Sequence, residues 1–208
     1  MTLLAKKTRF GSCLRLAVCL IGMALPLAAS SVVSFDFAEL SQRAQSVIGG
    51  RITKVVSETD PASGYIYSTV TVAVTDAVPA QHAGREYSFR MLGGEADGQS
   101  LYISDLPQLK AAESVVLFLQ SNTSTVFGPT VGLWQGVFFV EDGPNGKQAV
   151  TDSQRRPVLG ISDRQLVRGF SRESRGNVQG LAAEGAPEGL GLTEFFNQVR
   201  AHRGVAGQ

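Results

Sequence analysis

The chain has 208 residues, with 19 Lys and Arg against 18 Asp and Glu. A chain of this length can bury one sizeable core and is short for two. Both cysteines, Cys13 and Cys19, lie near the N-terminus, so disulfides, thiolate metal sites and a cysteine nucleophile are excluded from the rest of the chain.

Residues 1–30 have the pattern of a secretory signal peptide. Three basic residues within the first nine precede an apolar run from Leu16 to Leu25, and small residues follow. This run is shorter than the about 20 residues that a membrane span needs, so we predict cleavage between Ala28 and Val32 rather than an anchor. The product is expected to be periplasmic or secreted, without a transmembrane helix, and to carry 15 basic and 18 acidic residues.

A short helix is predicted at the start of the remaining chain. Phe37, Leu40 and Ala44 recur at helical spacing. Either Ser34 or Asp36 can cap its N-terminus, and we expect the helix to end within residues 43–46.

Short β-strands fill the middle of the sequence. The clearest, residues 65–74, places Ile66, Val70 and Val72 on one face and threonines on the other. The Gly49-Gly50 pair within another predicted strand indicates a bulge or bend. In all, we predict strands over residues 47–56, 65–74, 87–91, 115–119, 131–134, 137–140 and 148–150. Closely spaced strands without alternating helices favour an antiparallel barrel or sandwich.

Beyond Pro157 the pattern changes, and we predict a helical, Gly-rich extension over residues 158–208. Ser162 and Gln165 resemble a capping box, which predicts a helix through the residues that follow. Residues 176–191 read as a linker. A final helix is predicted over residues 193–203, and its adjacent Phe195 and Phe196 should dock it on the barrel domain, residues 31–157.

The first of these predicted helices carries four arginines at positions 164, 168, 172 and 175. On a helix they fall within about 80° of one another, opposite Leu166, Val167 and Phe170. This basic face could bind an anionic lipid surface or polymer, or an extracytoplasmic protein, although charge runs more often only solvate a helix. Arg164, Arg168, Arg172 and Arg175 are therefore candidate partner-binding residues.

Trp134 is a second candidate, because an exposed tryptophan could contact a sugar or a peptide. Its apolar neighbours Leu133 and Val137 favour a core position instead.

Residues that could carry catalysis or bind a metal are few. His82 and His202 are far apart in sequence, whereas transition-metal sites need three or four ligands and a Ser-His-Asp triad needs a histidine near its partners. Glu141 and Asp142 are explained by the Gly-Pro-Asn-Gly turn that follows them. We predict no cofactor, no metal and no catalytic set.

Several strand segments resemble known proteins: residues 47–52, 65–72, 92–94, 116–119 and 131–136, with Pro107. In this succession the chain resembles a group of exported bacterial proteins of unknown function. Their barrel is similar to the OB-type fold of netrin-like modules and tissue inhibitors of metalloproteinases. The resemblance implies a small antiparallel OB-like barrel, but a fold does not by itself specify an activity. Those inhibitors chelate zinc through a mature N-terminal cysteine, which this chain lacks after cleavage.

These patterns together predict an exported, non-enzymatic binding module in the cell envelope or outside the cell, with no nucleic-acid partner. One alternative is an envelope hydrolase that works through carboxylates alone. Another is a protease inhibitor that does not depend on cysteine.

Overall fold

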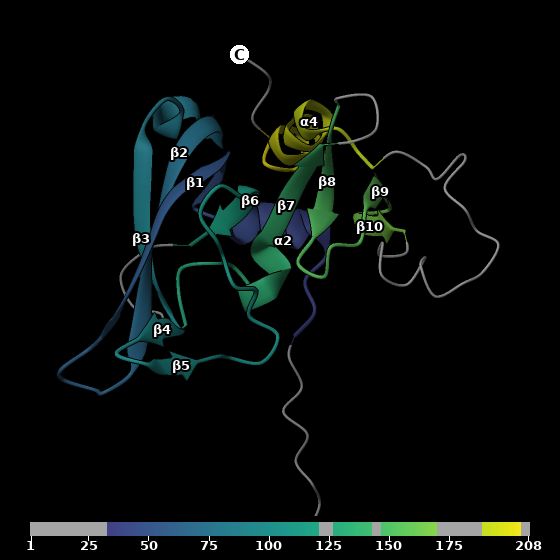
Figure 1. Cartoon of the computed structure of the whole chain (residues 1–208). Helices are drawn as coiled ribbons and strands as arrows, with labels where there is room; N and C mark the ends of the chain where they lie inside the picture. The colour runs from purple at the N-terminus through teal and green to yellow at the C-terminus, as the bar shows by residue number, and fades with distance from the viewer. Residues whose placement is uncertain (1–32, 121–126, 143–146, 170–188, 205–208) are drawn as a thin grey trace, which may run out of the picture. The chain divides into compact units, whose positions relative to one another are not determined.

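The computed structural model describes residues 33–120, 127–142, 147–169 and 189–204. From Ser34 onward these residues belong to one compact unit, drawn in Figure 1. The elements in chain order are α2 (Phe37–Arg43), β1 (Ser46–Thr59), β2 (Ile66–Val78), η1 (Ala80–His82), β3 (Glu86–Leu92), β4 (Gly94–Ala96), β5 (Gln99–Leu101), β6 (Ser114–Leu119), η2 (Leu133–Gly136), β7 (Val137–Asp142), β8 (Gln148–Asp152), β9 (Val158–Ser162), β10 (Gln165–Arg168) and α4 (Leu192–His202). The predicted signal peptide, and most of the predicted linker over residues 176–191, lie outside the described residues.

The main sheet has six antiparallel strands in the order β3-β2-β1-β6-β7-β8. The prediction of a mainly β protein with a helix toward each end is therefore confirmed. Among the described residues β3 and β8 are not hydrogen-bonded to each other, so the sheet is not closed into the expected barrel.

The long β1–β2 hairpin bends where the glycine pair was predicted to interrupt β1. The pairing register shifts between Gly49 and Gly50. A Cβ on Gly50 would lie 2.1 Å from the carbonyl oxygen of Ala73, so only glycine fits there without moving the partner strand. The bend lets β1 pair with β2 along its whole length and with β6 at its N-terminal end only.

One face of the sheet, which we call the helix-covered face, packs against α2, α4 and the β9–β10 hairpin. α2 begins with a capping box: Asp36 Oδ1 accepts from the Glu39 amide at 2.7 Å, and Glu39 Oε2 accepts from the Asp36 amide at 3.0 Å. The Asp36 cap and the docking of α4 were both predicted and are confirmed. Phe195 and Phe196 are fully buried.

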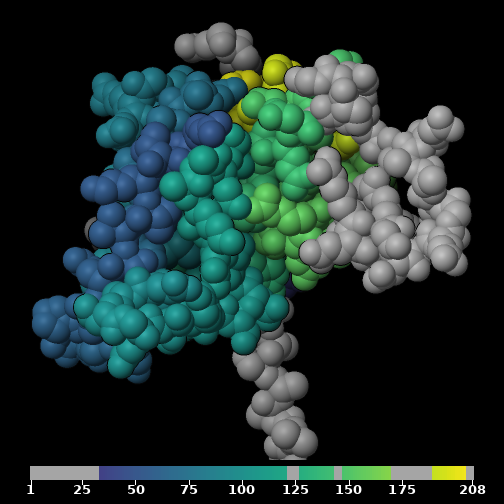
Figure 2. Space-filling view, in the orientation of Figure 1, coloured from purple at the N-terminus to yellow at the C-terminus, as the bar shows by residue number. Residues whose placement is uncertain are grey.

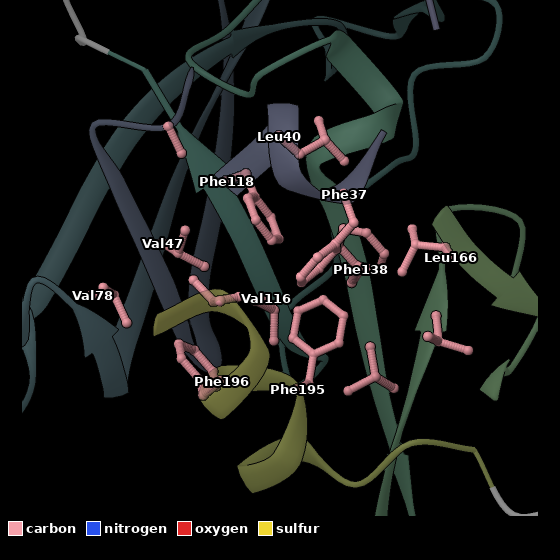
Figure 3. Close-up of a cluster of buried hydrophobic side chains, with 14 of the residues drawn as sticks. Phe37, Leu40, Val47, Val78, Val116, Phe118, Phe138, Leu166, Phe195 and Phe196 are labelled. Carbon is pink, nitrogen blue, oxygen red and sulfur yellow. The ribbon is translucent and has the colours of Figure 1, made fainter. Parts of the chain in front are cut away.

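The aromatic rings of the helix-covered face form one cluster (Figure 3). Phe195 lies 5.3 Å from Phe37 and 5.1 Å from Phe138 between ring centroids, and Phe118 lies 5.9 Å from Phe37. These distances and tilted geometries are those at which aromatic pairs attract. The cluster joins the beginning and the end of the described chain to the middle of the sheet.

The opposite face, which we call the pocket face, buries a second apolar cluster without any helix in it. Strand residues such as Val72, Phe89 and Leu117 fill its centre. Leu109, in the loop between β5 and β6, covers it and is 6% exposed. Near Leu109, a cavity lies between the pocket face and the short β4–β5 hairpin.

Two of the predicted elements are wrong. Residues 131–134 were predicted as a strand but form a turn and the start of η2. The segment after Ser162 was predicted as a helix but forms the turn and the second strand of the β9–β10 hairpin. Asp163 and Arg164 lie in the turn at φ 47° and 68°. Two consecutive residues with positive φ make the tight turn that suits the twist of a hairpin.

Candidate ligand-binding pocket

A cavity of about 310 Å³ lies where the ends of β1, β2 and β3 meet the β4–β5 hairpin. Figure 2 shows the segment that carries β4 and β5, in teal, on the surface beside the blue tip of the β1–β2 hairpin. A pocket of this volume suits a small organic ligand. The cavity is lined by Val55, Ser57, Ser68, Val70, Met91, Leu92, Gly93, Gly94, Glu95, Leu101, Tyr102, Ile103, Leu106, Pro107, Gln108, Leu109 and Lys110.

The walls of this pocket are mainly apolar. Val70 and Met91 come from the buried side of β2 and β3, and Val55 from β1 is half-buried. Leu106 and Leu109 close the opposite side and pack on the same apolar cluster. A ligand that enters would therefore gain mainly from the burial of apolar surface.

A pair of serine hydroxyls forms the least exposed polar part of the lining. Ser57 and Ser68 are directly opposite each other on β1 and β2, and their Oγ atoms are 2.8 Å apart. Ser68 Oγ also donates to the carbonyl oxygen of Gly93 at 2.6 Å. The pair is thereby linked to the residue that leads into β4.

Gly93 and Gly94 shape the wall beside these hydroxyls. Their φ angles are 106° and 133°, a region that favours glycine. A Cβ on Gly94 would lie 2.3 Å from Ser68 Oγ and 2.4 Å from Ser57 Oγ. The hydroxyl pair and the path of the chain into β4 therefore both depend on glycine at position 94.

An exposed acidic and phenolic pair borders the pocket. The hydroxyl of Tyr102 donates to Glu95 Oε1. This hydrogen bond stabilises the neutral phenol and raises the pKa of Tyr102 above its ordinary value. Among the described lining residues Glu95 is the one carboxylate.

The structure places Arg164 and Arg168 in different environments rather than on one helix face. Arg164 lies in the β9–β10 turn, where its Nε is 3.2 Å from Asp36 Oδ2 and its carbonyl oxygen accepts from the Phe37 amide. Arg168 ends β10, with its Nε 3.0 Å from Asp152 Oδ2. The predicted basic helix face is thus wrong for these two arginines. Arg172 and Arg175 lie outside the described residues.

Asp152 is the shared partner of two arginines in this part of the chain, Arg156 and Arg168. Its carboxylate is nearly buried and also accepts from the Arg156 side chain at 2.8 Å and from the backbone amides of Gln154 and Arg156. A buried carboxylate needs such partners. The arginines at positions 156 and 168 therefore fix the loop after β8 to the β9–β10 hairpin.

The other residues singled out in the sequence lie away from the pocket. Trp134 is half-buried in η2 and does not line it. His82 packs edge-on against Tyr87, and His202 against Phe37. Within the described ranges no three or more His, Cys, Asp and Glu side chains are grouped as a metal site would require.

One pair of glutamates does lie close together in space. Arg155 is 2.6 Å from Glu113 and 3.6 Å from Glu141, and its guanidinium lies over the ring of Phe139. Both carboxylates pair with the same arginine, which is a structural arrangement rather than an acid and base pair around a substrate. Glu141 and Asp142 are the last two residues of β7. The turn that was predicted to follow them, residues 143–146, lies outside the described residues.

Sequence reasoning did not identify the pocket, although residues 92–94 and Pro107, which carry part of the resemblance, line it. No helix in the described part of the chain is long and apolar enough to cross a membrane.

Comparison of the chain with protein-family models, curated proteins and solved structures gives no match.

Proposed function

We propose that this protein is an exported, non-enzymatic binding module whose pocket takes a small, largely apolar organic ligand. The observation that carries this proposal is the cavity of about 310 Å³ at the end of the pocket face. Its walls are mainly aliphatic, and a few polar groups are placed among them, which is the usual composition of small-molecule sites. The signal-peptide pattern of residues 1–30 supports a place in the periplasm or outside the cell.

The same geometry gives less support to a hydrolase that uses carboxylates. Such an enzyme needs two carboxyl groups that flank the bond to be cleaved. Glu95 is accompanied by Tyr102 rather than by a second acid in the described lining. Binding of an apolar molecule requires no such partner.

Toluene is a suitable probe of the pocket because it is apolar and small enough to enter. Titration of the ¹⁵N-labelled protein with toluene should shift the amide NMR signals of Val70, Met91 and Leu109, which line the cavity. In a Val55→Trp variant the larger side chain should fill the cavity and abolish these shifts.

Val56→Trp is the matched control, because Val56 is the next residue on β1 and is 43% exposed. Its response to toluene should equal that of the unmodified chain. Shifts that persist in Val55→Trp, or that centre on residues away from the cavity, would contradict the proposal.

A further inference from the structure

The hydrogen bonds of the pocket's serine pair run in one direction. Ser68 Oγ is 2.6 Å from the carbonyl oxygen of Gly93. A carbonyl only accepts, so Ser68 must donate its single hydroxyl hydrogen there. In the 2.8 Å contact between Ser57 and Ser68 the donor is therefore Ser57. Ser57 therefore donates to Ser68, and Ser68 donates to the carbonyl oxygen of Gly93.

Ser57 is the first donor in this series of hydrogen bonds, and it donates its only hydroxyl hydrogen to Ser68. Its oxygen retains lone pairs, so a further partner must bring a hydrogen of its own. Ser57 is half-buried and lines the cavity beside Val55 and Val70. Toward a ligand, the hydroxyl of Ser57 thus acts as an acceptor.

The side chains of the lining that can donate lie in more exposed positions. Lys110 and Gln108 are both exposed, and the Tyr102 hydroxyl is engaged with Glu95. Polar groups gain more from a hydrogen bond, and lose more without one, where water is excluded. The half-buried acceptor Ser57 should therefore select among ligands more strongly than the exposed groups do.

We propose that the pocket selects an apolar ligand that carries an uncharged hydroxyl or N–H donor, and that this donor binds Ser57 Oγ. This inference depends on the proposed binding function. A ligand that places a carboxylate or ether oxygen against Ser57 would bring two acceptors together. An ammonium would have to be desolvated among aliphatic side chains, which is costly.

Two probes of nearly the same shape test this inference: p-cresol, which has a hydroxyl donor, and p-fluorotoluene, which has none. NMR titration of the full chain should show p-cresol binding about three to ten times more tightly, the effect of one neutral hydrogen bond. In Ser57→Ala this preference should disappear.

Ser88→Ala is the control, because Ser88 forms a similar hydroxyl pair with Thr71, 2.9 Å apart, on exposed positions of the same sheet. It should retain the preference for p-cresol. Equal binding of both probes to the unmodified pocket would overturn the donor inference and leave the binding function standing. A preference that survives in Ser57→Ala would overturn the assignment to Ser57. Failure of both probes to shift the pocket signals would overturn the binding function as well.

Discussion

The helix-covered face and the pocket face of the main sheet are closed in different ways. On the helix-covered face, α2 and α4 insert phenylalanine rings that meet Phe118 and Phe138 from the strands. On the pocket face, a loop that carries Leu106 and Leu109 covers the strands and leaves a cavity beside the β4–β5 hairpin. The comparison shows that helices close the helix-covered face with aromatic rings, whereas the pocket face retains a cavity beside its buried cluster.

Truncation of an aromatic ring on the helix-covered face should give the largest effect. Phe195→Ala removes a fully buried ring from the cluster and should lower the free energy of unfolding by about 3–5 kcal/mol. Leu106→Ala, at the partly buried wall of the cavity, should cost less than half as much, because space is already present beside it. Urea unfolding followed by circular dichroism measures both. Equal costs would contradict this expected difference between the two faces.

A smaller effect is expected from the glycine that shapes the pocket. Gly94→Ala forces a side chain into a left-handed backbone and against two hydroxyls, so we expect a loss of about 3 kcal/mol. Gly98→Ala, in the β4–β5 turn, has φ of 74° and no atom within 4 Å of the added Cβ, so it should cost about 1 kcal/mol. Thermal unfolding compares the two variants. Similar losses of stability in the two variants would show that Ser57 and Ser68 move aside at little energetic cost.

The smallest effect concerns the pH response at the edge of the pocket. Because Glu95 accepts from the Tyr102 hydroxyl, the pKa of Tyr102 is raised, and the hydrogen bond persists below that raised pKa and is lost as the pH rises through it. Glu95→Gln should lower the pKa of Tyr102 without a measurable change in stability at neutral pH. Ultraviolet titration of phenolate absorbance, with a Tyr102→Phe variant to assign the signal, measures the shift. An unchanged titration in Glu95→Gln would exclude Glu95 as its cause.

The six strands of the main sheet and the helices α2 and α4 could be predicted because each is encoded in a local pattern. The run from Val115 to Leu119 is apolar at every position, and all five residues are buried. The adjacent Phe195 and Phe196 required a docking site, and the structure provides one. Such patterns depend on the periodicity of one segment only.

The β9–β10 hairpin and the pocket could not be predicted in this way. Asp163-Arg164 lacks the glycine that usually marks a tight hairpin turn, and the short apolar run around Leu166 fits a helix as well as a strand. The pocket takes one or a few side chains from each of several segments, including Ser57, Ser68 and Leu109. Only the pairing register of β1 with β2 places the two serines opposite each other.

The contact between α2 and α4 has a consequence for the order in which the chain can fold. Phe37 and Phe195 are separated by most of the sequence, yet their ring centroids are 5.3 Å apart. Until the residues of α4 have been synthesised, the rings of α2, β6 and β7 that contact Phe195 are exposed to water or bound by a chaperone. A nascent chain that ends before Leu192 would therefore expose this apolar aromatic surface and would be prone to aggregate.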